Sequence, residues 1–195
     1  MAKQLPIILA SASPRRRELL AQTGIPFEVI VPTLAEVDGA MERQSPAQQA
    51  EALAFFKAST IRDSHPDRWV LGADTIVALG ECVLGKPRDR AHAAGMLASL
   101  AGTRHAVITG VALLGPAGRS IASDTTFVTM RKLSAEELVA YLDSGQWAGK
   151  AGAYGIQEIG DRFVERVEGS FSNVMGLPME LVERMLQQMI GKQTG

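Results

Sequence analysis

The sequence has one cysteine and contains no long hydrophobic run. Cys82 is the only cysteine among the 195 residues, which excludes an internal disulfide and a zinc site built from cysteines. No stretch approaches the roughly 20 apolar residues of a membrane helix, so we expect no membrane partner. The apolar run at residues 5–10 contains Pro6 and is short for the core of a secretory signal. We therefore expect a cytoplasmic protein.

Net charge and aromatic residues are scarce as well. The chain has 20 basic and 21 acidic residues, a net charge of -1, and 5% aromatic residues. Proteins that bind nucleic acid usually carry an excess of basic residues on one face, so we expect no nucleic-acid partner. Any positive charge that matters for function must then be local. Hydrophobic residues make up 46% of the chain, which is enough to fill the core of a globular protein.

Strand patterns and helix patterns alternate along the chain. Strands are expected at residues 6–10, 27–31, 69–79, 105–114, 121–130 and 163–167, with the third broken by Gly72, Asp74 and Thr75. Helices are expected to begin at Ser13, Ser45, Asp89, Ser134 and Pro178. Two of these starts have the pattern of a capping box, Ser45 with Gln48 and Ser134 with Glu137. The alternation predicts an α/β fold with a mixed sheet, in a single domain over residues 1–195.

The segment LASASPRRREL, residues 9–19, places three arginines at the start of a predicted helix. Arg15, Arg16 and Arg17 fill its first turn, where cations oppose the helix dipole. A bound polyanion would reverse that cost, because helix N-termini and guanidinium groups both bind phosphate well. Ser11 and Ser13 add hydroxyl groups. A capped helix with solvated arginines is an equally good interpretation of these residues alone.

Two further positions carry a charge inside an apolar pattern. Lys57 falls within the apolar stripe of the helix predicted from Ser45, so its amine either extends to the edge of the core or faces an acid or phosphate. Asp74 interrupts the apolar run WVLGADTIVAL, and a carboxylate there needs a metal, a lysine or a turn N–H as partner. An Asx turn remains an alternative for Asp74.

Two loops could approach a ligand. GECVLGK, residues 80–86, nearly matches a phosphate-binding loop, but Pro87 stands where the magnesium-binding hydroxyl belongs, so we reject that interpretation. Lys86 remains a candidate phosphate contact or a plain surface lysine. The glycine-rich segment 149–160 carries Tyr154 and Gln157 as its distinctive side chains. The three histidines show no metal-binding spacing, and we assign them no role.

Five motifs in order resemble those of the Maf family of nucleotide pyrophosphatases. They are SASPRRREL, LGADTIV, GKP, AGAYGIQ and GSFSNVMGLP, and they span about residues 9 to 178. The resemblance implies a mixed twisted sheet in two lobes, an active-site cleft between them, and a homodimer. It implies hydrolysis of nucleoside triphosphates to the monophosphate and pyrophosphate with Mg, Mn or Co. The AGAYGIQ and NVMGLP forms are similar to the branch that acts on dTTP and UTP.

The same resemblance implies a set of site residues. It places substrate phosphates on Ser11, Arg15, Arg16, Lys57 and Lys86, and the metal on Glu36 and Asp74. Asp74 would be the catalytic residue, and substrate choice would depend on Arg16, Thr75 and Gln157. The chain departs from the family at Glu158, where a glycine often follows the glutamine. Alternative functions are a non-catalytic nucleotide-binding regulator of septum formation and a 7-methyl-GTP pyrophosphatase.

Overall fold

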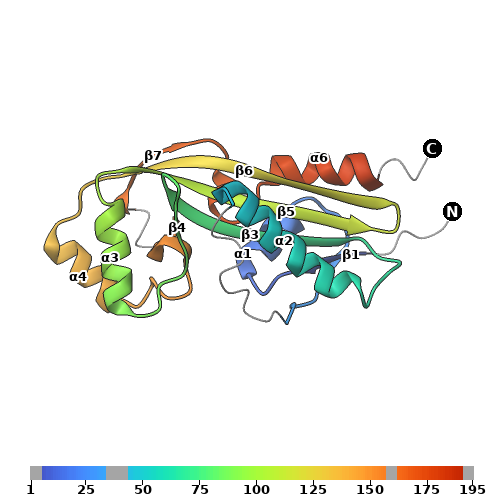
Figure 1. Ribbon diagram of the computed structural model, residues 1–195, viewed down its shortest axis with the longest axis horizontal. Helices are drawn as coiled ribbons and strands as arrows, with labels where there is room; N and C mark the ends of the chain where they lie inside the picture. The colour runs from blue at the N-terminus through green and yellow to red at the C-terminus, as the bar shows by residue number, and fades with distance from the viewer. Residues whose placement is uncertain (1–5, 34–43, 157–161, 191–195) are drawn as a thin grey trace.

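The computed structural model describes residues 6–33, 44–156 and 162–190, which form one mixed sheet with helices on both faces (Figure 1). Its seven strands are β1 Ile7–Ala10, β2 Phe27–Val29, β3 Val70–Leu79, β4 Cys82–Leu84, β5 Arg104–Gly115, β6 Gly118–Met130 and β7 Val164–Glu168. The strand order is β2-β1-β3-β5-β6-β7, with β4 paired to β3. The β1 strand runs parallel to β2 and β3, and the other pairs are antiparallel. The predicted α/β class with a mixed sheet is confirmed.

Four of the helices begin at the residues that the capping patterns predicted. The helices are α1 Pro14–Ala21, α2 Pro46–Arg62, α3 Arg90–Leu100, α4 Ala135–Asp143, α5 Phe171–Val174 and α6 Met179–Ile190, with a short 3-10 helix η1 at Ala151–Ala153. Ser45 and Ser134 both form complete capping boxes, and Ser13 and Asp89 cap α1 and α3 through their side chains. A tight turn at residues 115–118 joins β5 to β6, and these two long strands run side by side (Figure 1).

The β3 strand presents alternate side chains to the two faces of the sheet, as the two-residue period of a strand requires. Val70 packs with Ala54 and Ala58 on the buried side of α2, and so does Ile8 of β1. Its neighbour Leu71 packs with α1 and α6 on the opposite face. Two consecutive residues of β3 therefore face different helices. By the same alternation, the side chains of Asp74 and Thr75 lie on opposite faces of the sheet.

The third predicted strand is continuous, so the expected break at Gly72, Asp74 and Thr75 was wrong. The glycine serves a close helix-to-sheet contact instead. A Cβ built on Gly72 would lie 2.4 Å from the carbonyl oxygen of Ala54, and one on Gly110 would lie 2.2 Å from that of Ala50. Glycine on the sheet and alanine on α2 let the two backbones approach closely.

Two hydrophobic clusters share the face opposite α2. One gathers α1, α6 and the start of β3 around Leu20, Leu71 and Val182. The other gathers α3, α4 and η1 around Val77, Leu97 and Tyr141. They occupy opposite ends of the long strands (Figure 1), and the space between them holds the site described below. Among the described residues, no helix is long and apolar enough to cross a membrane.

Candidate active site

The site begins at a notch in the edge of the sheet. On its outer side, β3 pairs with β1 through residues 70–72 and with β4 through residues 77–79. Residues 73–76 have no strand partner on that side within the described chain. Asp74 and Thr75 lie in this gap, so side chains from both faces of the sheet reach one cavity. The opening arises because the pairing of β3 with the parallel strand β1 ends at residue 72 and its pairing with the antiparallel strand β4 begins at residue 77.

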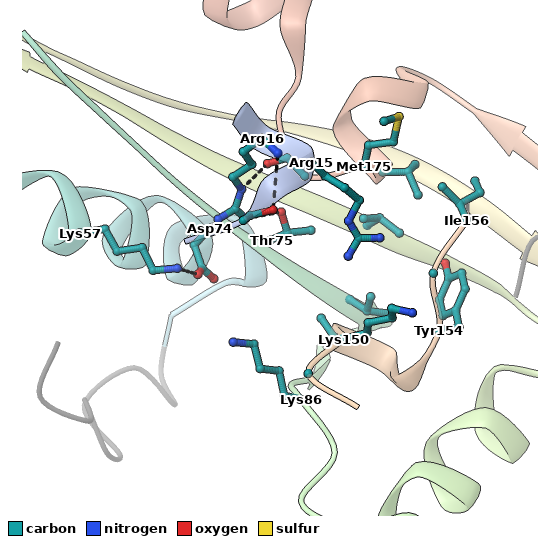
Figure 2. A pocket seen from close by; sticks show the side chains of 18 residues that line it. Arg15, Arg16, Lys57, Asp74, Thr75, Lys86, Lys150, Tyr154, Ile156 and Met175 are labelled. Atoms are coloured by element: carbon teal, nitrogen blue, oxygen red, sulfur yellow. Dashed lines mark hydrogen bonds and ion pairs between the residues drawn. The ribbon is translucent and has the colours of Figure 1, made fainter. Parts of the chain in front are cut away.

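Asp74 extends toward α2 and forms an ion pair and hydrogen bond with Lys57 (Figure 2). Both side chains are about four-fifths buried, at 17% and 20% exposure. Burial lowers the pKa of Lys57, the Asp74 carboxylate opposes that shift, and the positive charges of Arg16 and Lys86 add to it. Lys57 therefore faces an acid instead of extending along the core edge, which settles the alternative that the sequence left open.

Thr75 lies on the opposite face and contacts Arg16 from the first turn of α1 (Figure 2). The Arg16 guanidinium donates to the Thr75 hydroxyl at 3.0 Å and to the carbonyl of Gly176 at 2.7 Å. Burial lowers its pKa, the Asp74 carboxylate opposes this, and Arg15 adds to the lowering. Because a guanidinium stays protonated in proteins, Arg16 is a partly buried cation that interacts electrostatically with Asp74.

Arg15, Lys86 and Lys150 complete the positive lining of the cavity (Figure 2). The Lys86 and Lys150 loops are tied together by a hydrogen bond of 3.1 Å from the Gly152 amide to the Gly85 carbonyl. Five cationic side chains thus line the cavity. Of the described residues that line it, Asp74 alone carries a carboxylate. Such an excess of positive charge suits a polyanion.

A buried pair anchors the glycine-rich loop that carries Lys150. The Tyr154 hydroxyl lies 2.6 Å from Nε2 of His105, and both side chains are almost fully buried. Burial lowers the pKa of His105 to about 4 and raises that of Tyr154. Tyr154 also lines the cavity, so His105 fixes one wall of the site from behind.

The cavity unites six of the residues predicted from the sequence, namely Arg15, Arg16, Lys57, Asp74, Thr75 and Lys86. Ser11 is 4% exposed and does not line the cavity; its hydroxyl accepts from the Ser13 amide at 3.1 Å. Its contact with substrate stays a prediction. Glu36 and Gln157 lie outside the described residues, as does Glu158, so their roles also stay predictions.

Lys150 is the cavity residue that sequence reasoning missed. It lies between Gly149 and Gly152, whose φ angles of 72° and 66° mark a left-handed turn. A charged residue inside a glycine-rich turn was the available signal. Such turns let the backbone approach a ligand.

The described residues offer a partial metal site. They contain no group of three or more His, Cys, Asp or Glu side chains that could hold a metal ion. Magnesium, however, is often held by one or two carboxylates together with substrate phosphates. The Asp74 carboxylate in this cation-lined cavity fits that pattern, because only one of its oxygens contacts Lys57.

The fold and the cavity define an α/β protein with a cationic, carboxylate-containing site at a strand edge. A sequence profile described as Maf-like protein matches residues 6–189. The chain belongs to the Maf family. The dTTP/UTP pyrophosphatase of Deinococcus radiodurans is 45% identical over 93% of this chain and 91% of that protein. The proteins of the same name from Symbiobacterium thermophilum and Syntrophotalea carbinolica are 46% and 47% identical, over 93% and 92% of this chain and 93% and 83% of those proteins.

Proposed function

We propose that the chain is a nucleoside triphosphate pyrophosphatase that hydrolyses dTTP and UTP to the monophosphate and pyrophosphate. The observation that carries the proposal is the convergence of five cations and one carboxylate on a single cavity. The relatives named dTTP/UTP pyrophosphatase, similar over nearly the whole chain, support the substrate class.

The cations have different tasks along a bound triphosphate. Arg15, Lys86 and Lys150 line the cavity outside the Asp74 and Lys57 pair and are the phosphate contacts. Arginine binds phosphate through paired N–H groups, whereas lysine acts as a point charge. When the α–β bond breaks, negative charge grows on the departing pyrophosphate. Preorganised cations stabilise that charge without reorganising at the moment of reaction.

Asp74 is the residue that acts on water. Among the described residues that line the cavity, Asp74 is the one with a carboxylate, and Lys57 of α2 holds that carboxylate in place. A carboxylate oriented toward the α-phosphorus takes the proton of the attacking water as general base. Asp74, with Glu36 as predicted from the sequence, would hold a divalent metal, which supplies Lewis-acid stabilisation of phosphoryl oxygens. The identity of that metal, Mg, Mn or Co, belongs to the same proposal.

Base selection rests on the apolar part of the cavity lining. Val77, Val107, Ile156 and Met175 supply an apolar wall there, next to Thr75. Gln157 follows Ile156 directly in the sequence. Its amide offers one acceptor and donor hydrogens, which match the imide N–H and carbonyl of uracil and thymine.

The proposal is tested by pyrophosphate release from a panel of triphosphates with a divalent metal. The panel contains dTTP, UTP, CTP, GTP and 7-methyl-GTP. Faster release from dTTP and UTP supports the proposal. Release mainly from 7-methyl-GTP would assign the chain to the other branch, and binding without any release would favour a regulator. Sedimentation of the same preparation tests the homodimer that the family resemblance implies.

Asp74→Asn tests the assigned role of the carboxylate. The amide keeps the size of the side chain but cannot take a proton, so we expect kcat to fall by about 10²- to 10⁴-fold. Binding of UTP should persist, because the change removes a negative charge from a phosphate site. Asp67→Asn is the matched control, since Asp67 is exposed and outside the cavity. Retained turnover in Asp74→Asn would refute the role.

A further inference from the structure

A chain of hydroxyl groups runs inward from the cavity through the sheet. The Arg16 guanidinium donates to the Thr75 hydroxyl at 3.0 Å, and that hydroxyl lies 2.9 Å from the hydroxyl of Thr109 on β5. The Thr109 hydroxyl lies 3.0 Å from the main-chain carbonyl of Asn173. Thr75 and Thr109 are register partners on neighbouring strands, so they share one face of the sheet. Thr109 is fully buried and does not line the cavity.

The two ends of this chain determine the direction of every hydrogen bond in it. A guanidinium can only donate and a carbonyl can only accept, whereas a threonine hydroxyl has one hydrogen and two lone pairs. The Thr109 hydrogen must therefore point to the Asn173 carbonyl, since two oxygens 3.0 Å apart require a hydrogen between them. The Thr75 hydrogen must then point to Thr109. All bonds run one way, from Arg16 to Asn173.

The inner end of the chain is firmly anchored. Asn173 is fully buried, and its side-chain amide donates to the Val107 carbonyl at 2.9 Å and to the Thr126 hydroxyl at 3.0 Å. Its main-chain carbonyl also accepts from the Gly176 amide at 2.9 Å. The acceptor that orients Thr109 is therefore part of the backbone of α5 and cannot rotate away.

This direction of the hydrogen bonds leaves the Thr75 hydroxyl able only to accept a hydrogen bond from a ligand in the cavity. Its hydrogen is committed to Thr109 and one lone pair to Arg16, so the remaining lone pair can only accept. A nucleobase on the apolar wall beside Thr75 meets an acceptor from Thr75. Uracil and thymine carry N–H at ring position N3. Cytosine carries a lone pair at the same position, which would face the lone pair of Thr75.

We propose that Thr109 is a positioning residue for base selection, which holds the Thr75 hydroxyl as an acceptor for the N3–H of uracil or thymine. The inference rests on the proposed nucleotide-binding function and extends it to a residue that never touches the ligand. Without the Thr109 hydroxyl, the Thr75 hydrogen is released and can turn toward the cavity. Thr75 then donates as readily as it accepts, and cytosine is no longer rejected.

The test measures the Kd of α,β-methylene analogues of UTP and CTP by calorimetry with magnesium, because these analogues cannot be cleaved at the α–β bond. The readout is the ratio of the two Kd values in each variant. Wild type should favour the UTP analogue, and Thr109→Val should reduce that preference by about three- to tenfold, the range for one hydrogen bond. Thr109→Ala should give the same ratio as Thr109→Val, and Thr109→Ser should restore the wild-type ratio.

Two controls separate positioning from general loosening of the core. In a Thr75→Val background, Thr109→Val should leave the ratio unchanged, because Thr109 acts only through Thr75. Thr126→Val removes another fully buried hydroxyl that contacts Asn173, and it should lower stability without altering the ratio.

An unchanged ratio in Thr109→Val, an equal change in Thr126→Val, or equal binding of both analogues by wild type would overturn the inference. Absence of pyrophosphate release from natural UTP would overturn the proposed function instead, since the analogues measure binding alone.

Discussion

Lys150 extends from the turn before η1 to the cavity that Arg15 and Lys86 also line. It contributes positive charge without belonging to the Asp74 and Lys57 pair. Under the proposed function, a lysine of this kind would interact with the triphosphate in the ground state and the transition state alike. Loss of such uniform binding raises KM and leaves kcat nearly unchanged.

We therefore expect Lys150→Met to raise the KM for UTP by about tenfold with less than a threefold change in kcat. Steady-state kinetics of pyrophosphate release checks this split. Lys132→Met is the matched control, because Lys132 is exposed and outside the cavity. A fall in kcat with unchanged KM would instead give Lys150 a role confined to the transition state.

His105 couples the stability of the site to pH. Its pKa falls from 6.5 to about 4 because burial disfavours the charged imidazole. Between these values the unfolded chain binds a proton that the folded chain does not, so stability is lost as pH falls from about 6.5 to about 4. At about 1.4 kcal/mol per pH unit, the loss from this residue is on the order of 3 kcal/mol.

His105→Gln removes the titrating group, so we predict a smaller loss of stability than in wild type when pH is lowered from 7 to 5. Urea unfolding at both pH values measures the difference. His92→Gln provides the comparison, since His92 lies at the start of α3 and away from Tyr154. An equal pH dependence in wild type and His105→Gln would show that the buried imidazole is not the cause.

For individual residues, the sequence predicted which charged side chains belong to the site but not which residues they contact. Arg15, Arg16, Lys57 and Asp74 stood out because each charge conflicts with its local pattern. The contact between Lys57 and Asp74 joins a helix to a strand and has no local signature. Lys150 carried only a weak signal, its place in a glycine-rich turn, and the approach of its loop to the Lys86 loop brings it to the cavity.

Among the elements, α2 lies very close to the sheet. Ala50, Ala54 and Ala58 form its buried side, and Gly72 and Gly110 lie opposite them. This contact sets the height of Lys57 above β3, and hence its distance from Asp74. A single added methyl group should disturb both stability and activity.

We predict that Gly110→Ala destabilises the protein by about 2 kcal/mol or more, because its Cβ would overlap the Ala50 carbonyl. Turnover should fall even well below the unfolding temperature, as α2 carries Lys57 away from Asp74. Gly95→Ala in α3 has no atom within 4 Å of the new Cβ and should stabilise by about 0.5 kcal/mol. Urea unfolding and UTP turnover of both variants test the pair. Equal stability of the two would contradict this packing account.

Elements with local start signals were predicted well. Capping residues and turn glycines act within a few positions, so the helices at Ser13, Ser45, Asp89 and Ser134 begin where expected. The short β4 and α5 were not predicted, because three or four residues carry too little pattern. The rejection of residues 80–86 as a phosphate-binding loop is confirmed, because the strand β4 occupies the middle of this segment.

In the whole molecule, the cavity exists because two hydrophobic clusters share one face of the sheet without merging. The β5 and β6 strands connect the clusters, and α1, α5 and η1 surround the gap between them (Figure 1). Motif order along the chain implied such a cleft through family resemblance. Periodicity alone gave only the α/β class, because the space between two cores depends on long-range packing.

The central claim is that this cavity directs water to the α-phosphorus of a pyrimidine nucleoside triphosphate. Hydrolysis of UTP in water enriched in the heavy oxygen isotope, followed by mass spectrometry of the products, tests it most directly. The account predicts UMP and pyrophosphate as products, with the heavy oxygen in UMP. Heavy oxygen in pyrophosphate, or release of UDP and phosphate, would contradict it.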